Sequence, residues 1–169
     1  MKIIDTRRSV REFTNQEVSD KAIKKILDAA MMAPSARNQQ PWEFLVVKDQ
    51  EKKDKIASLV PSMRMASGAS FLVIFLTNKE KLTAPLYYQQ DLASATTIAM
   101  LEARSLGIGS VWCGVSPVPE KMKVVREVFN ISNDMIEPFS LVCFGYPKNS
   151  DAFFKAKRIN KKLIHFEEL

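Results

Sequence analysis

Residues 90–114 read "QDLASATTIAMLEARSLGIGSVWCG", a long helical pattern that passes directly into a strand pattern. Apolar residues recur at helical spacing in its first part, and Asp91 is suited to cap the start of such a helix. Gly107 can adopt the left-handed turn that ends the helix, and the run after it predicts a strand over 110–113. Small residues and few charges indicate that this helix is central to the fold.

The flanking segments alternate between helix and strand patterns. One amphipathic helix follows Ser19 and must end before Pro34, because proline cannot continue a helix. Further elements are strands over 42–47, 71–77 and 139–144, a helix from "SPVPE" (116–120) to Val128, and a basic, then apolar, tail that predicts an extended arm. Since no repeat or linker divides the chain, we expect a single domain over residues 1–169.

Composition sets outer limits on the class of protein. The chain has 169 residues and 46% hydrophobic content, which suffices for one core, and no apolar run reaches the roughly 20 residues of a membrane span. Cys113 and Cys143 each lie in an apolar strand pattern, which favours buried free thiols and a cytoplasmic, soluble protein without a membrane partner. The formal charge is 25 − 19 = +6, which is compatible with an anionic ligand.

Most catalytic motifs are absent from the sequence. A single His165 and two cysteines thirty positions apart leave no pattern for a metal site. There is no G-x-S-x-G, no phosphate-binding P-loop and no G-x-G-x-x-G, and the chain has five glycines in all. An anion would therefore have to be held by side chains.

The segment "TRRSVREF" (6–13) offers such side chains, namely Arg7, Arg8, Ser9 and Arg11. Guanidinium groups bind phosphate through forked donors, and a neighbouring hydroxyl adds a short hydrogen bond. The alternative is a solvated basic helix end, which is common on protein surfaces.

The segment "PSARNQQPW" (34–42) is unusually polar and rigid for a connection between two apolar segments. Its two prolines and several amides are more than a simple turn needs, so we interpret it as a binding loop. The alternative is that Asn38, Gln39 and Gln40 only satisfy loop backbone groups. For Trp42 we prefer the structural interpretation, in which it begins a core strand.

Taken in order, "RRSVREF", "APSARNQQPWEF", the stretch 90–114, "FGYP" and the tail ending in "LIHFEEL" resemble the FMN-dependent nitroreductase family in its short, single-domain form. The resemblance covers nearly the whole chain. It implies an α+β fold, with a mixed β-sheet flanked by helices and an extended C-terminal arm. Ala36 and Arg37 depart from the pattern, because many relatives carry small hydroxyl residues there, and this leaves the substrate open.

The resemblance also implies site residues. Arg7 and Ser9 look like ligands of the flavin phosphate, Arg8 lies alongside the ribityl chain, and Arg11 approaches the N1 and O2 edge of the ring. Pro34, Ser35 and Asn38 are expected to reach the flavin of the other subunit of a homodimer. Cys113 and Gly114 are expected near the dimethyl and N5 side of the flavin, and Lys157 and Arg158 at the phosphate, with Arg158 preferred.

No side chain is assigned a catalytic role, because the flavin carries the redox chemistry. Cys113 lacks an evident activator, so we assign it proximity to the flavin and no nucleophilic role. The implied activity is that of an FMN-dependent NAD(P)H oxidoreductase. NADH or NADPH delivers hydride to flavin N5, and a nitroaromatic, quinone or activated alkene then takes it in a ping-pong cycle.

Several alternatives stay open. A family member with dehalogenase or flavin-fragmenting activity and a non-catalytic flavin-binding protein would share these motifs. A basic nucleic-acid binder would explain the charge, but the sequence lacks an RNP-type motif and zinc spacing. In "TAPLYYQQ" (83–90), Tyr87 or Tyr88 either stacks over an electron acceptor or lies in a dimer interface, and the sequence does not choose between these roles.

Overall fold

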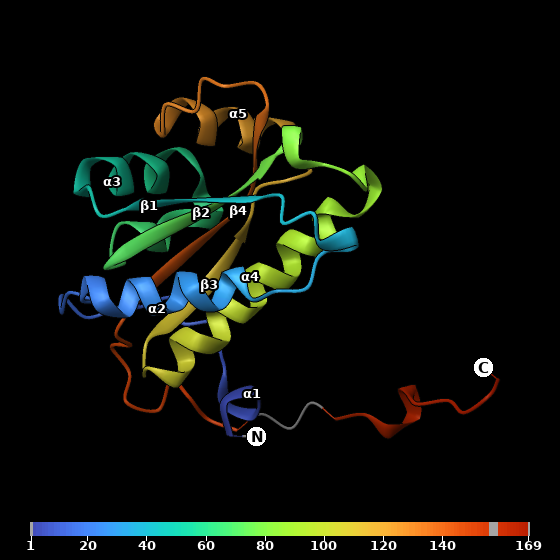
Figure 1. The fold of residues 1–169 in the computed structure, drawn as a ribbon. Helices are drawn as coiled ribbons and strands as arrows, with labels where there is room; N and C mark the ends of the chain where they lie inside the picture. Colours follow the sequence, from blue (N-terminus) through green and yellow to red (C-terminus); the bar gives the residue numbers. More distant parts are fainter. Residues whose placement is uncertain (1, 156–158, 169) are drawn as a thin grey trace.

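The computed structural model describes residues 2–155 and 159–168 and contains one four-stranded sheet with helices on both faces (Figure 1). The strands are β1 (Trp42–Val47), β2 (Phe71–Asn78), β3 (Gly109–Gly114) and β4 (Ile136–Gly145), in the spatial order β1-β2-β4-β3. All three pairings are antiparallel, and an isolated bridge between Ser9 and Ser110 is parallel. The α+β prediction is confirmed, with an antiparallel sheet in place of the expected mixed one.

Alternation along β2 divides the core into two layers. Leu72 and Ile74 point to one face, which is covered by α3 (Gln50–Leu59), the 3₁₀ helix η2 (Pro61–Ala66) and α5 (Pro119–Val128). Phe71 and Phe75 point to the other face, which is covered by α2 (Asp20–Met31) and α4 (Tyr88–Ser105). Because apolar layers cover both faces, β2 is buried along almost its whole length.

The remaining elements are short: α1 (Lys2–Thr6) and the 3₁₀ helices η1 (Ala36–Asn38), η3 (Lys79–Lys81), η4 (Pro85–Tyr87) and η5 (Lys161–Leu163). No helix within the described residues is long and apolar enough to cross a membrane.

Most of the predicted helix ends are confirmed. The Ser19 side chain caps α2 by accepting a hydrogen bond from the Ala22 N–H, and Gly107 has φ +74° directly after α4. The predicted cap at Asp91 is wrong, because α4 begins at Tyr88 and Asp91 is buried inside its first turn. The turn of η4 already starts the helix, and the Asp91 carboxylate binds a distant loop.

The sequence reasoning missed α3. Its sequence "QEKKDKIASL" has few apolar residues, so the helical periodicity is weak. The helix is nevertheless capped by Asp49, whose side chain accepts a hydrogen bond from the Lys52 N–H, and it buries Ile56 in the core.

The N-terminal segment crosses one end of the sheet. The Val10 N–H donates to the Ser110 carbonyl (3.0 Å), and the Thr14 N–H donates to the Tyr146 carbonyl (2.8 Å). A Cβ atom added to Gly109 would lie 2.8 Å from the Val10 Cβ, which is closer than real atoms approach. The close approach of Val10 to β3 therefore requires glycine at position 109.

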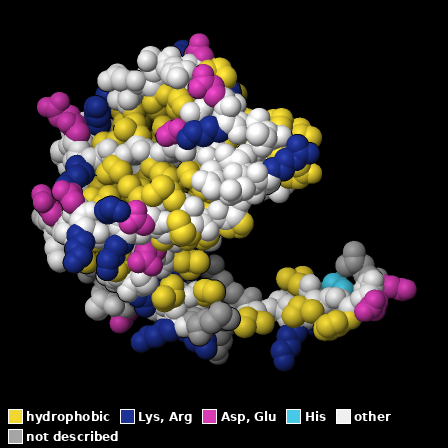
Figure 2. All heavy atoms as spheres, in the orientation of Figure 1, with side chains coloured by type: hydrophobic (Ala, Val, Ile, Leu, Met, Phe, Trp, Pro, Cys, Tyr) yellow, Lys and Arg dark blue, Asp and Glu magenta, His cyan; other side chains and the backbone are white. Residues whose placement is uncertain are grey.

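The start of the C-terminal arm is held by two cation–π contacts. The Arg104 guanidinium lies 4.1 Å from the Phe153 ring centroid, and the Arg8 guanidinium lies 4.9 Å from that of Phe154. Beyond them, residues 159–168 run away from the body of the subunit with apolar side chains along their length (Figures 1 and 2). This agrees with the predicted extended arm.

Candidate functional site

The cluster predicted in "TRRSVREF" lies beside the start of β3. Ser9 forms the bridge to Ser110 and is exposed, and Arg7 is half-buried. Arg11 is exposed, and its guanidinium donates to the Ser9 carbonyl (3.4 Å). The backbone contact with β3 thus presents Ser9 and Arg11 at the surface on the same short segment.

The Arg8 side chain is buried and forms its hydrogen bonds within the same chain. Its side chain is only 8% exposed, and its guanidinium donates to the carbonyls of Asp5 (2.6 Å) and Arg7. The Nε atom is buried and has no hydrogen-bond partner. Arg8 therefore ties α1 to the arm, and its Nε leaves one buried donor unsatisfied close to Arg7 and Ser9.

A hollow of about 350 Å³ lies next to this segment. Its lining includes Arg11, Arg64 and Lys148, with Glu12 as the acidic member. The excess of positive charge makes the hollow suitable for an anionic or electron-rich group. Sequence reasoning missed Arg64 and Lys148, because neither lies in a recognisable motif and only the fold brings them beside Arg11.

Cys113 lies on β3, close to the positive charges of Arg11 and Lys121. Its Sγ is 3.7 Å from the Met65 Sδ, and Met65 also lines the hollow. A hydrogen bond from Cys143 lowers the pKa of the Cys113 thiol, burial opposes that shift, and the nearby charges of Arg11 and Lys121 add to it. Both cysteines are buried free thiols, as the sequence predicts.

The pKa of Cys143 moves in the opposite direction. Its hydrogen bond to Cys113 and its burial both raise the pKa of this thiol well above the ordinary value. Gly114, which follows Cys113, is exposed, and a Cβ added there would meet nothing within 4 Å. The backbone at the end of β3 is therefore open to the close approach of a ligand.

The loop "PSARNQQPW" has an unusual backbone. Three residues of the loop have positive φ values: 51° for Arg37, 54° for Asn38 and 43° for Gln40. This left-handed region is unfavourable for residues that carry a Cβ atom. Ser35 stabilises the turn by accepting a hydrogen bond from the Gln40 N–H (3.1 Å), and the Gln40 side chain donates to Asn38 (2.8 Å). The loop is held in one conformation by its own polar groups.

Two buried side chains anchor this loop to the rest of the subunit. Gln39 accepts hydrogen bonds from the N–H groups of Thr83 (3.0 Å) and Ala84 (2.8 Å). Asp91 accepts from the Ala36 N–H (2.8 Å) and from the Gln39 side chain (2.6 Å). For Gln39, the alternative of satisfying backbone groups is confirmed, and Trp42 is a buried core residue of β1 as predicted.

Pro34 and Ser35 line a second hollow, of about 280 Å³, together with Tyr87 and the first turns of α4. This hollow and the cationic one share no lining residue. Within the described residues, Arg11 and the pair Pro34 and Ser35 therefore line two different hollows. The predicted phosphate contacts Lys157 and Arg158 lie outside the described residues.

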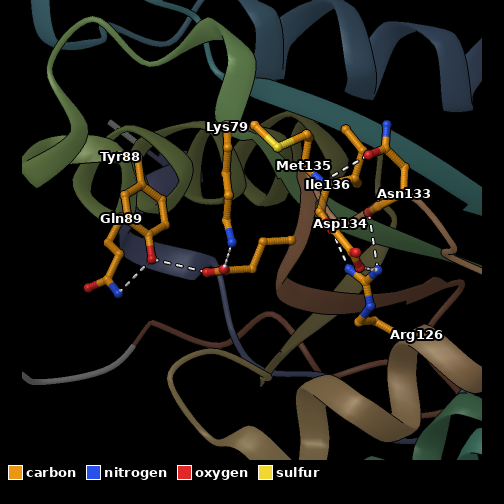
Figure 3. A network of polar contacts seen from close by, with 9 residues as sticks. Lys79, Tyr88, Gln89, Arg126, Asn133, Asp134, Met135 and Ile136 are labelled. Atoms are coloured by element: carbon orange, nitrogen blue, oxygen red, sulfur yellow. Dashed lines mark hydrogen bonds and ion pairs between the residues drawn. The ribbon is translucent and has the colours of Figure 1, made fainter.

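Tyr88 belongs to a polar network on the neighbouring surface (Figure 3). Its hydroxyl donates to one carboxylate oxygen of Glu137 (3.1 Å), and the Lys79 amine binds the other (2.7 Å). Burial raises the pKa of the Tyr88 hydroxyl, and the charge of Glu137 adds to this shift. A second group of polar contacts lies nearby, in which the Arg126 guanidinium binds the Asp134 carboxylate (3.2 Å).

The acidic, cysteine and histidine residues within the described ranges form no cluster of three that could hold a metal ion. The candidate site thus consists of a cationic hollow beside β3 and a rigid amide loop, with little acid–base machinery. This combination is typical of proteins in which a bound cofactor supplies the chemistry.

Comparison with known proteins identifies the class. The model of the nitroreductase family matches residues 4–90 and 62–146, so the chain belongs to this family. A protein of Archaeoglobus fulgidus named as an NADH dehydrogenase/NAD(P)H nitroreductase is 42% identical over 99% of this chain and 97% of its own length.

Solved structures agree with this assignment. A Clostridium acetobutylicum protein named as an NADH oxidase superposes with a TM-score of 0.94 at 39% identity, covering 99% of both chains. An FMN-dependent nitroreductase from Clostridium difficile superposes with a TM-score of 0.89 at 25% identity, covering 99% of this chain and 98% of its own.

Proposed function

We propose that the protein is an FMN-dependent NAD(P)H oxidoreductase that reduces a nitroaromatic, a quinone or an activated alkene. The observation that carries the proposal is the cationic hollow lined by Arg11, Arg64 and Lys148, on the segment where the family resemblance expects the cofactor. Family membership and the names of the relatives support the same activity.

The residues present fit an anionic cofactor. Arg11 and Arg64 bring two guanidinium groups to one hollow, and Lys148 adds a third positive charge. Gly114 leaves the end of β3 open, since a Cβ placed there would meet nothing within 4 Å. The site thus combines positive charge and space.

In this proposal Arg7 and Ser9 hold the phosphate of FMN, with Lys157 and Arg158 as further candidates. Arg11 stabilises negative charge on the pyrimidine edge of the ring, because a fixed guanidinium does so better than reorganising water. When bound, FMN accepts a hydride from NADH or NADPH and passes reducing equivalents to the acceptor. The protein contributes binding, orientation and charge, and Cys113 contributes packing.

We further propose that two subunits share each site. The loop carrying Pro34, Ser35 and Asn38 is separate from the cationic hollow in one subunit, and a homodimer can bring one from each subunit together. The buried free thiols agree with a reducing cytoplasm.

The test begins with the absorbance spectrum of the purified protein. We expect the absorbance of bound flavin, and bleaching when NADH or NADPH is added without oxygen. A colourless protein that does not take up added FMN contradicts the proposal, and flavin that neither nicotinamide reduces indicates a non-catalytic flavin-binding protein. Reoxidation of the bleached protein by candidate acceptors, aryl halides included, then separates nitroreductase from dehalogenase activity.

A further inference from the structure

The loop at 34–40 and the segment at 83–91 form one rigid unit. Gln39 is hydrogen-bonded to the backbone of both Thr83 and Ala84, and Asp91 is bonded to Ala36 and to Gln39. These bonds involve buried side chains, so breaking them would leave unsatisfied polar groups. The loop is therefore held in a fixed position relative to the turn that carries Leu86 and Tyr87.

The hollow between these segments has a distinctive chemistry. Pro34 and Ala36 form one side, and Tyr87, Gln90 and Ser94 lie on the α4 side. Besides Tyr87, the lining contains one ionisable residue, Asp91. Asp91 is 5% exposed, and both of its carboxylate oxygens accept hydrogen bonds from the loop. The hollow thus offers an aromatic ring, aliphatic surface and neutral polar groups.

The two tyrosines of this segment differ in what they can do. The Tyr88 hydroxyl is bound to Glu137, which Lys79 holds from its other side (Figure 3). Tyr87 lines the hollow and is 51% exposed, and the neighbouring Leu86 is 89% exposed. Large apolar side chains at this exposure, on a turn that is otherwise fixed, are suited to contact with a ligand.

We propose that Tyr87 determines acceptor specificity by stacking on a planar, uncharged ring, a quinone or a nitroaromatic, with Leu86 beside it. The inference rests on the proposed function, because in the shared site the unit formed by 34–40 and 83–91 faces the flavin of the second subunit. It assigns the aromatic stacking role to Tyr87 and the anchoring of the segment to Tyr88.

The experiment compares Tyr87→Ala and Tyr87→Phe with the parent, all as FMN-loaded proteins. Calorimetric titration of the oxidised protein with menadione, without a nicotinamide, measures binding alone. We expect the dissociation constant to rise by about three- to tenfold in Tyr87→Ala and to stay within about twofold in Tyr87→Phe, which keeps the ring. The kcat/KM for menadione should fall by the same factor.

Two controls make the result specific. Leu86→Ala should weaken menadione binding, and Leu59→Ala should not, because Leu59 is an exposed leucine on α3 that lines neither hollow.

Unchanged menadione binding in a flavin-loaded, nicotinamide-reducible Tyr87→Ala protein overturns this inference and leaves the proposed function intact. If that variant also dissociates into monomers at higher concentration than the parent, Tyr87 is an interface residue. A parent protein that binds no FMN overturns the proposed function, and the inference with it.

Discussion

At the scale of single residues, Asp91 shows how a polar side chain serves a distant segment. The helical pattern around it correctly predicts α4, but its position suggested a cap. The carboxylate instead bonds to Ala36 and Gln39, which are far from it in sequence. A side chain's partner can be predicted where it is local, as for Ser19, and not where only the fold brings it close.

Arg7 gives the first prediction, which concerns cofactor affinity. Replacing Arg7 with Ala should weaken FMN binding by about 1.5–3 kcal/mol, the scale of a lost hydrogen bond to a charged group. Fluorescence titration of the apoprotein with FMN measures the change.

Riboflavin provides the matched ligand for this variant, because it lacks the phosphate. Its affinity should be the same for Arg7→Ala and the parent. Equal FMN affinity in the two proteins at moderate ionic strength would remove Arg7 from the phosphate site.

At the scale of elements, the contact between the N-terminal segment and β3 positions the cationic hollow. Sequence patterns predicted all four strands, because each is an apolar run bounded by turn residues. They did not predict η2, which carries Arg64, since its sequence has neither helical nor strand periodicity. The cationic hollow could therefore be anticipated only through Arg11.

Gly109 gives a second prediction. In Gly109→Ala the new methyl group would lie 2.8–2.9 Å from three Val10 side-chain atoms, so the N-terminal segment must move. We expect the free energy of unfolding to fall by about 1–3 kcal/mol and FMN affinity to fall with it, because Ser9 and Arg11 move together. Urea unfolding and FMN titration measure the two effects.

Gly68→Ala is the control for stability, since a Cβ there meets nothing within 4 Å. It should change the free energy of unfolding by less than about 0.5 kcal/mol. If Gly109→Ala has the same free energy of unfolding as Gly68→Ala, then Val10 does not pack closely against Gly109.

The contact between β1 and η3 gives a prediction about pH. The Lys81 amine donates to Glu43 (2.6 Å) and, with a further hydrogen bond from Asn78, lowers the pKa of this carboxyl below its ordinary 4.5 against the opposing effect of burial. A lowered folded-state pKa stabilises the protein above pH 4.5, and this stabilisation is lost as the pH falls through the folded value.

Glu43→Gln should therefore reduce the free energy of unfolding by up to about 1 kcal/mol at pH 7, as expected for a partly exposed pair. The difference from the parent should shrink steadily below pH 4.5. A double-mutant cycle with Lys81→Met, measured by urea unfolding at pH 7 and pH 3, isolates the coupling. A coupling that is as large at pH 3 as at pH 7 would contradict the ion pair.

At the scale of the whole molecule, the two halves of the candidate site lie in separate hollows of one chain. Family resemblance is the one feature of the sequence that suggests a site in which the two halves come from different subunits. Periodicity and propensity describe one chain and carry no information about a second copy. The same limit applies to the arm at 159–168, of which the sequence predicts only the extended course.

Mixed dimers test the shared site. If Arg7→Ala and Asn38→Ala each abolish flavin loading alone, subunit exchange should place both lesions in one site and leave the other intact. Statistical mixing makes about half of the dimers heterodimers, so about one flavin per heterodimer should return. Absorbance of the exchanged sample, with native mass spectrometry to confirm heterodimers, measures this. Confirmed heterodimers without flavin would show that each site is built from one subunit.

The left-handed residues at 37, 38 and 40 have a consequence for laboratory evolution. A residue other than glycine in this region costs up to about 1–2 kcal/mol, with asparagine at the low end, so the cost falls mainly on Arg37 and Gln40. A screen for heat resistance alone should therefore enrich glycine in this loop, because such variants tolerate higher temperature. Glycine at 38 and 40 also removes the amide pair that joins these two residues. Selection for stability should then favour glycine at positions 38 and 40, and selection for turnover should favour the native Asn38 and Gln40.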